Sequence, residues 1–232
     1  MAKKQSRALL YQKVAVAIGL VVAASIVIYV TTIVVTDIPM GEYQLGVHYE
    51  EVEDPRRIRG DKIEVMEFFS YGCIHCYNLE SELQPWVERN SDKVKFVRSP
   101  AMFDDAWRVL AQSYYTTENL GITARNHPAF FREIHDKKNP LTNLDRLANY
   151  FDGKGTTSAE YRAAFNSPET KRANAAADQR QRRFKVSSVP TMVVNGKYRV
   201  KTTANIGRSR LLDVVDYLVE QELAGKAQPT KE

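Results

Sequence analysis

Cysteine is scarce in this sequence. Its 232 residues contain two, Cys73 and Cys76, within the stretch YGCIHCYN at 71–78. A structural zinc site takes four ligands, usually from two such pairs, and the four histidines are scattered along the chain. Covalent haem attachment requires a histidine directly after the second cysteine, where this chain has Tyr77. The shortage of cysteine therefore argues against a metal centre, and we expect no metal or other cofactor.

Several other patterns are missing. The chain has no internal repeat, no low-complexity tract, no glycine-rich phosphate-binding loop and no Gly-x-Ser-x-Gly nucleophile turn. A broad basic surface is not expected either, although 33 basic residues stand against 28 acidic ones. Four of the basic residues lie in residues 1–13, which contain no acid, so the rest of the chain is almost neutral. The composition thus does not predict a nucleic-acid-binding protein.

Residues 14–35, VAVAIGLVVAASIVIYVTTIVV, contain no charged residue. As a helix this run would be about 33 Å long, which matches the ~30 Å hydrocarbon core of a bilayer. The alternative is a cleaved secretory signal, whose apolar region usually runs ~7–15 residues before a small-residue cleavage site. Here the run is longer, and the small pair Ala23-Ala24 lies in its middle. We therefore expect an uncleaved transmembrane anchor.

The charges around this run predict its orientation. Basic residues precede it in a tail at 1–13, and acidic residues follow it: Asp37, Glu42, Glu50, Glu51, Glu53 and Asp54. The positive-inside rule places the N-terminus in the cytoplasm and the chain after residue 36 outside. In a bacterium this describes a single-pass protein of the inner (cytoplasmic) membrane with a periplasmic domain. Disulfides persist in that compartment.

The rest of the chain reads as a β-rich beginning, a helical middle and a β-rich end. Residues 36–60 look like an extended linker, with glycine and proline as breakers. KIEVMEFF at 62–69 predicts a strand covered on both faces, followed by a helix that begins near Cys73 and a second strand at 93–99. This order is typical of a βαβ unit with a parallel strand pair.

Helical patterns then continue to about residue 184. Asp104 can cap a helix that ends at Asn119, and further helices are expected near 127–137, 143–151, 157–166 and 168–184. The strands TMVV at 191–194 and KYRV at 197–200 flank Asn195-Gly196, which predicts a tight hairpin. A final amphipathic helix reaches Leu223, and residues 224–232 read as a flexible tail.

The cysteine pair allows a structural and a redox interpretation. By the chain-entropy model, a disulfide that closes a four-residue loop stabilises by only about 2 kcal/mol, which is little for a lone staple. At a helix N-terminus, by contrast, unpaired N–H groups and the helix dipole lower the pKa of a thiol, so Cys73 would be the nucleophile. Cys76, one turn later, could resolve a mixed disulfide. His75 would stabilise the Cys73 thiolate, unless it is simply a solvated surface imidazole.

EFFSYGCIHCYN at 67–78 and VSSVPTMVVNGKY at 186–198, separated by helices, resemble the DsbA family of thiol:disulfide oxidoreductases. The resemblance covers about residues 45–223. It implies an α/β thioredoxin fold, built from residues 61–104 and 185–223, with a helical insertion at 105–184. It also implies a cis peptide bond between Val189 and Pro190 that faces the cysteines and helps to bind the main chain of the substrate.

Glu67 also fits the family, whose members place an acid beneath the second cysteine. It stands six residues before Cys73 in an otherwise apolar strand, where a buried carboxylate would have a raised pKa. The resemblance pairs it with Arg98, at a position where the family usually has lysine. The alternative is an edge residue that reaches solvent. Ile74 is a second departure, because the family usually has proline directly after the first cysteine.

The resemblance implies an oxidoreductase that donates the Cys73–Cys76 disulfide, its redox-active centre, to exported proteins with cysteine pairs. A quinone-linked membrane partner would reoxidise it, and a monomer is expected. An isomerase or reductase kept in the reduced state is an alternative with the same chemistry. A third possibility is a membrane-tethered chaperone or adaptor without enzymatic activity, whose function would survive replacement of Cys73.

Overall fold

The N-terminal part of the chain is described only over a short helical stretch. A computed structural model describes residues 16–27, 43–56, 58, 60–203 and 206–227, and residues 1–42 and 43–232 are separate units. Residues 16–27 are helical, whereas 14–15 and 28–35 of the expected anchor lie outside the described residues. Among the residues described, no helix is both long and apolar enough to cross a membrane.

A mixed sheet organises residues 43–227. Its strands are β1 (Glu50–Glu51), β2 (Ile63–Phe69), β3 (Val94–Pro100), β4 (Thr191–Val194) and β5 (Tyr198–Lys201), in the spatial order β1-β5-β4-β2-β3. The pair β2–β3 is parallel and the other pairs are antiparallel. The parallel pair confirms the expected βαβ unit, because the helix α2 (Ile74–Arg89) connects its two strands.

All seven residues of β2 are buried, as expected for a strand covered on both faces. Ile63 and Val65 point to a core shared with α2 and α8 (Arg208–Ala227), while Met66 and Phe68 point to a core on the opposite face. Side chains alternate along a strand, so Glu67 lies on the same face as Ile63 and Val65. Its carboxylate is therefore directed towards α2, the helix that carries the cysteines.

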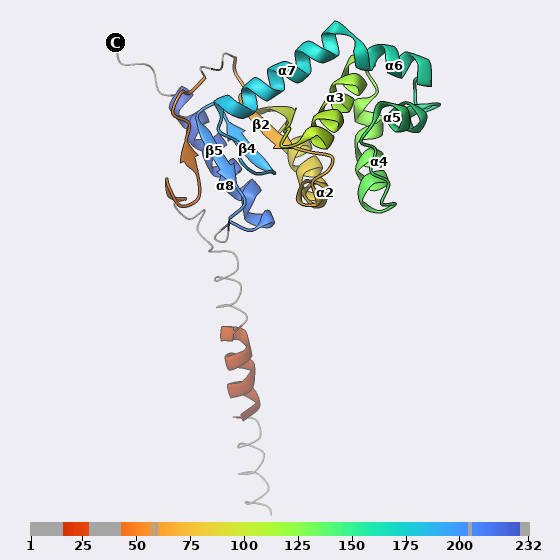
Figure 1. The fold of residues 1–232 in the computed structure, drawn as a ribbon. Coiled ribbons are helices and arrows are strands. Elements are labelled where there is room, and N and C mark those ends of the chain that lie inside the picture. Colours follow the sequence, from red (N-terminus) through yellow and green to blue (C-terminus); the bar gives the residue numbers. More distant parts are fainter. Residues whose placement is uncertain (1–15, 28–42, 57, 59, 204–205, 228–232) are drawn as a thin grey trace, which may run out of the picture. The chain divides into compact units, whose positions relative to one another are not determined.

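Five helices separate β3 from β4. They are α3 (Asp105–Asn119), α4 (Thr123–His135), α5 (Leu144–Phe151), α6 (Ser158–Asn166) and α7 (Pro168–Arg183). Asp104 caps α3 as predicted, because its side chain accepts a hydrogen bond from the Trp107 amide at 2.7 Å. Figure 1 shows α3 to α6 gathered on one side of the sheet, with α7 running back from α6 to the sheet.

An aromatic core joins these helices to the turn that carries the cysteines. Phe69, the last residue of β2, and Tyr71, in the turn that follows, belong to one buried cluster with Phe130, Phe131 and other rings of the inserted helices. The Tyr71 and Phe130 ring centroids are 4.4 Å apart in an edge-to-face arrangement. Both cysteines belong to the same cluster, so the packing of the helical region fixes the surroundings of the pair.

The predicted hairpin between β4 and β5 is confirmed. Val194 pairs with Tyr198, and both turn residues have positive φ, 50° at Asn195 and 66° at Gly196, as a type I′ turn requires. A Cβ atom at Gly196 would also come within 2.7 Å of the Arg56 carbonyl oxygen. The turn thus needs glycine both for its backbone and for the close approach of the N-terminal segment.

Three differences from the sequence predictions are larger than one residue. The segment 36–60 is not wholly an extended linker, because β1 pairs with β5 and the Val52 amide donates to Lys197 O at 2.7 Å. The strand β1 consists of Glu50 and Glu51, which show no alternation of apolar and polar residues. It forms because its backbone pairs with the edge strand β5. The last helix continues through 224–227 of the expected tail, because one glycine costs a helix only about 1 kcal/mol.

The third difference is the start of α4, which begins at Thr123 rather than near His127. Pro128 lies inside the helix. The side-chain amide of Asn126 donates through Nδ2 to Ile122 O at 2.9 Å and to Lys154 O at 3.1 Å. These contacts hold the first turn of α4 in place, and the second one comes from a distant part of the chain.

Candidate active site

Cys73 is the N-cap residue of α2. Its backbone is extended (φ −94°, ψ 114°), and its Sγ accepts a hydrogen bond from the Cys76 amide at 3.3 Å. In its protonated form the thiol also donates to the Val189 carbonyl oxygen, 3.5 Å from Cys73 Sγ. Both cysteines are thiols in the structure and both are buried, Cys76 completely. The side chain of Cys73 thus takes the place of the oxygen that usually caps a helix.

The two thiols have opposite acidities. The pKa of Cys73 is lowered to about 6, chiefly by a hydrogen bond from the Cys76 thiol. Burial of Cys73 opposes this shift, and hydrogen bonds from the backbone amides of Cys76 and His75 add to it. Burial, and then the hydrogen bond and charge of Cys73, raise the pKa of Cys76 well above its usual value. At neutral pH, Cys73 is therefore the thiolate of the pair and Cys76 holds its proton.

His75 is exposed between the two cysteines. Its backbone amide donates to the Cys73 sulfur, and its positive charge, when present, also lowers the Cys73 pKa. The histidine thus acts on the thiolate through two groups, although its ring is solvated.

The peptide bond between Val189 and Pro190 is cis, and it lies in the loop between α7 and β4. Pro190 is buried and Val189 is partly exposed. The Val189 carbonyl oxygen is the acceptor of the hydrogen bond from the Cys73 thiol. The structure therefore places Val189, which forms the cis bond to Pro190, against Cys73, although 116 positions separate Val189 from Cys73 in the sequence.

Glu67 and Arg98 are cross-strand neighbours on β2 and β3. Glu67 is fully buried, which excludes the alternative of an edge residue, and its Oε2 accepts from Arg98 Nε at 3.1 Å. Its Oε1 has no hydrogen-bond partner. Burial raises the pKa of Glu67 to about 8, because the nearby Arg98 charge only partly offsets the loss of solvation. At neutral pH Glu67 therefore favours its protonated, neutral form, because burying an ionised carboxylate costs more than burying a neutral carboxyl group.

Glu80 on α2 shares Arg98 with Glu67. Arg98 Nη2 lies 3.1 Å and 3.2 Å from the two Glu80 oxygens. Burial favours neutral Glu80, but His127 and Arg98 outweigh it and lower the Glu80 pKa. The sequence analysis missed this residue. Its spacing was a usable signal, because Glu80 follows Cys76 by four residues and therefore lies on the same side of the helix.

His127 is the second residue that the sequence analysis did not place in the site. Its Nδ1 shares a 2.6 Å hydrogen bond with the Tyr71 hydroxyl, and its Nε2 lies 3.4 Å from Glu80 Oε1. Burial lowers its pKa, so this histidine favours the neutral form. Glu80, Arg98 and His127 line a cavity of about 920 Å³ between α2 and α4. Glu80 and Arg98 thus have a route to solvent through this cavity.

Comparison with known proteins agrees with this geometry. Residues 64–219 match the model of the DSBA-like thioredoxin domain. The thiol:disulfide interchange protein DsbA of Pseudomonas aeruginosa strain PAO1 is 37% identical over 184 residues, which cover 79% of this chain and 87% of the relative. Its counterpart in Burkholderia cepacia is 30% identical over 178 residues, covering 76% and 84%. This chain belongs to the DsbA family.

Solved structures of DsbA proteins are similar over the same region. The crystal structure of Pseudomonas aeruginosa DsbA has a TM-score of 0.76 at 36% identity and covers 81% of this chain and 98% of its own. Xylella fastidiosa DsbA has a TM-score of 0.73 at 35% identity, covering 78% and 98%. The expected thioredoxin-like α/β fold is thereby confirmed. The chain is a thiol:disulfide oxidoreductase of the DsbA type.

Both departures from the usual DsbA pattern can be placed in the structure. Ile74, where proline is usual, is the first residue of α2 and its side chain is 44% exposed beside Cys73. Arg98, where lysine is usual, contacts two carboxylates at once through its planar guanidinium group. A lysine ammonium is a compact point charge and does not present two donors in a fixed plane. Arginine therefore suits a site with two acids.

Proposed function

We propose that this DsbA-family protein oxidises cysteine pairs in exported proteins. A substrate thiolate attacks Cys73 Sγ, the bond between Cys73 and Cys76 breaks, and Cys76 takes up a proton. The second cysteine of the substrate, as a thiolate, then attacks the sulfur of the first substrate cysteine in the mixed disulfide. Cys73 leaves as a thiolate. The substrate loses two electrons and the cysteine pair gains them.

The acidity of Cys73 carries this proposal. A thiol with a low pKa is a good leaving group, so the second step is fast. A thiolate stabilised in the folded, reduced protein also makes the disulfide easier to reduce, which favours the transfer of oxidising equivalents to substrates. The pKa of about 6 at Cys73, beside a strongly raised pKa at Cys76, is the pattern that this direction requires.

We assign the neighbouring residues supporting roles. His75 stabilises the Cys73 thiolate, and the main chain at Val189 and Pro190 binds the extended backbone of the substrate. Glu67, with Arg98 beside it, holds the proton that Cys76 takes up on reduction and gives back on reoxidation. A buried carboxyl with a pKa of about 8 can do both near neutral pH.

We further propose a single-pass anchor at residues 14–35 in the inner membrane, with the cytoplasmic tail at 1–13 and the catalytic domain in the periplasm. The uncharged run and the charge asymmetry on its two sides support this topology. A quinone-linked membrane protein would reoxidise the cysteine pair, and tethering would keep the two proteins close together. The catalytic domain would work as a monomer.

The redox equilibrium of the purified protein with glutathione tests the direction of transfer. We expect a reduction potential nearer to the ~ −120 mV of DsbA than to the ~ −270 mV of thioredoxin. Replacement of His75 by alanine should make the potential more negative, because the Cys73 thiolate loses a stabilising charge. A parent potential close to that of thioredoxin would favour the reductase or isomerase instead.

A further inference from the structure

The loop at 184–190 determines where the Val189 carbonyl stands relative to Cys73. Its β4 end is secured by the central sheet and by a hydrogen bond from Thr191 Oγ1 to Ser188 O at 2.8 Å. Its other end leaves the C-terminus of α7 and is not held by strand pairing. The carbonyl groups at the end of a helix lack partners within the helix, so they need donors from elsewhere.

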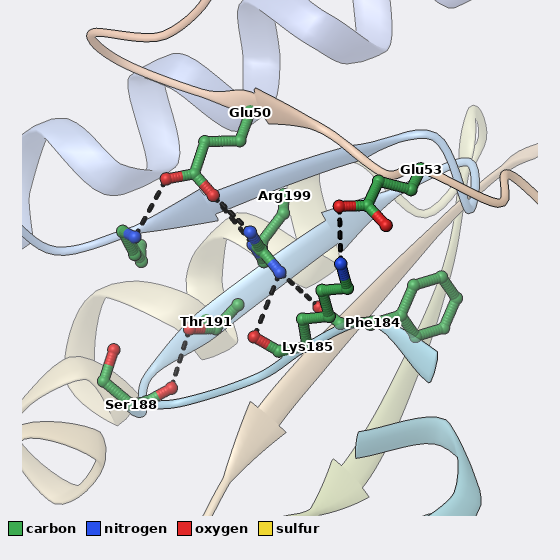
Figure 2. A network of polar contacts seen from close by, with 8 residues as sticks. Glu50, Glu53, Phe184, Lys185, Ser188, Thr191 and Arg199 are labelled. Atoms are coloured by element: carbon green, nitrogen blue, oxygen red, sulfur yellow. Dashed lines mark hydrogen bonds and ion pairs between the residues drawn. The ribbon is translucent and has the colours of Figure 1, made fainter. Parts of the chain in front are cut away.

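Those donors come from Arg199 on β5. Its Nη1 donates to Phe184 O at 2.5 Å and to Lys185 O at 3.0 Å. Phe184 is the C-cap of α7, and Lys185 has a left-handed backbone (φ 47°) that turns the chain out of the helix. Arg199 therefore holds the point at which the loop leaves α7, as Figure 2 shows.

Glu50 of β1 orients this arginine. Its Oε2 accepts from Arg199 Nε at 3.1 Å and from Arg199 Nη2, while its Oε1 lies 2.9 Å from Lys201 Nζ. Hydrogen bonds from Lys201 and Arg199 lower the pKa of Glu50, so the carboxylate is charged at neutral pH. Figure 2 shows Arg199 between Glu50 on one side and the loop carbonyls on the other.

Two further ion pairs link the same N-terminal segment to the end of α7, but both are exposed. They join Glu53 to Lys185 and Asp54 to Arg183. Exposed pairs contribute little to the stability of the folded state. Arg199 is less exposed, with 17% of its side chain accessible, and it is the group that contacts the loop carbonyls directly.

We propose that Arg199, held by Glu50, is a positioning residue for the loop that presents Val189 to Cys73 and to the substrate. The N-terminal strand β1 would then be part of the catalytic apparatus rather than a linker alone. This inference rests on the proposed function, because it assumes that substrates bind along the main chain at Val189 and Pro190.

The test compares two substrates in the oxidised full-length protein. Arg199→Met removes the donors but keeps an aliphatic stem. We expect kcat/KM for a synthetic peptide with two cysteines to fall about tenfold, mainly through KM, as for the loss of one hydrogen bond to a charged group. Oxidation of dithiothreitol, which has no peptide backbone to bind, should change less than twofold. Glu50→Gln should have a smaller effect of the same kind.

Asp54→Asn is the matched control, because it removes an exposed ion pair from the same segment, and it should match the parent with both substrates. Hydrogen exchange of residues 184–190, followed by mass spectrometry, should be faster in Arg199→Met. Equal losses with both substrates, or parent-like values with both, would overturn the role of Arg199. If the parent oxidises neither substrate, the proposed function fails. The role of Arg199 is tested separately by hydrogen exchange: if exchange at residues 184–190 is the same in Arg199→Met as in the parent, Arg199 does not position this loop.

Discussion

Glu67 shows how a single side chain can be costly for the fold and useful for the chemistry. It is completely buried, one of its oxygens has no partner, and it shares Arg98 with Glu80. Burial raises its pKa to about 8, so the folded protein holds a proton that the unfolded chain would release at a much lower pH. In the mechanism that we propose, the same property would allow Glu67 to exchange a proton with Cys76 near neutral pH.

The pH dependence of stability follows from this shift. A carboxyl with a raised pKa in the folded state binds more protons folded than unfolded, so stability falls as pH rises from about 4.5 to about 8. We expect Glu67→Gln to be more stable than the parent at pH 9, by an amount on the order of a few kcal/mol, and close to it at pH 5. Urea unfolding of the oxidised proteins, in which neither cysteine titrates, measures this difference. Parallel pH curves would mean that Glu67 stays ionised throughout.

At the scale of elements, the inserted helices shape the active-site turn directly. A Cβ atom at Gly72, the residue before Cys73, would come within 2.7 Å of Trp107 Nε1 on α3. The Trp107 ring in turn lies 5.4 Å, between centroids, from that of Phe103. The helical region therefore forms one wall of the site, and the turn before α2 has no room for a side chain.

We expect Gly72→Ala to destabilise the folded protein by about 1–3 kcal/mol, because either Trp107 or the turn must move. The oxidation of a peptide substrate should slow as well, since Cys73 follows directly. Gly207→Ala is the control, because a Cβ atom there meets nothing within 4 Å and its φ is not in the left-handed region. Denaturant unfolding gives the free energies. Equal stabilities for the two variants would show that Trp107 moves away without cost.

At the scale of the whole molecule, residues 1–42 and 43–232 are two units with different compositions. The first contains the uncharged run at 14–35, and the second contains every residue to which we assign a role in the redox reaction. Such a division allows each of the two units to fold independently of the other. It also places the strand β1 at the beginning of the second unit.

We expect the full-length protein to stay in the membrane fraction after an alkaline wash. Protease added from the periplasmic side should digest the chain after residue 36 and leave the N-terminal tail protected. Replacing Val21 and Val22 by lysine should release the protein from the membrane, because two charges in the middle of the span are costly. A mature form that begins near residue 37 and is recovered without membranes would show that the segment is a cleaved signal.

Local features of the sequence were sufficient for much of the fold and for the redox pair. The cysteines at a helix start, the Asp104 cap and the Asn195-Gly196 turn depend on residues a few positions apart, whose geometry the backbone fixes. Pro190 and the pairing of Glu67 with Arg98 came from the family resemblance rather than from spacing. The strand β1 was missed because two glutamates have no strand pattern of their own.

Only the tertiary structure could decide which distant groups meet. Val189 lies beside Cys73 across 116 positions, and Arg199 bonds to Glu50 across 149. Glu80 reaches Arg98 because α2 packs against the sheet, and His127 reaches Glu80 because the inserted helix α4 packs against α2. Such contacts depend on the packing of whole elements, and no local pattern of residues encodes them. The sequence by itself determined the chemistry of the cysteine pair, and the fold determined which buried charges and which loop act on it.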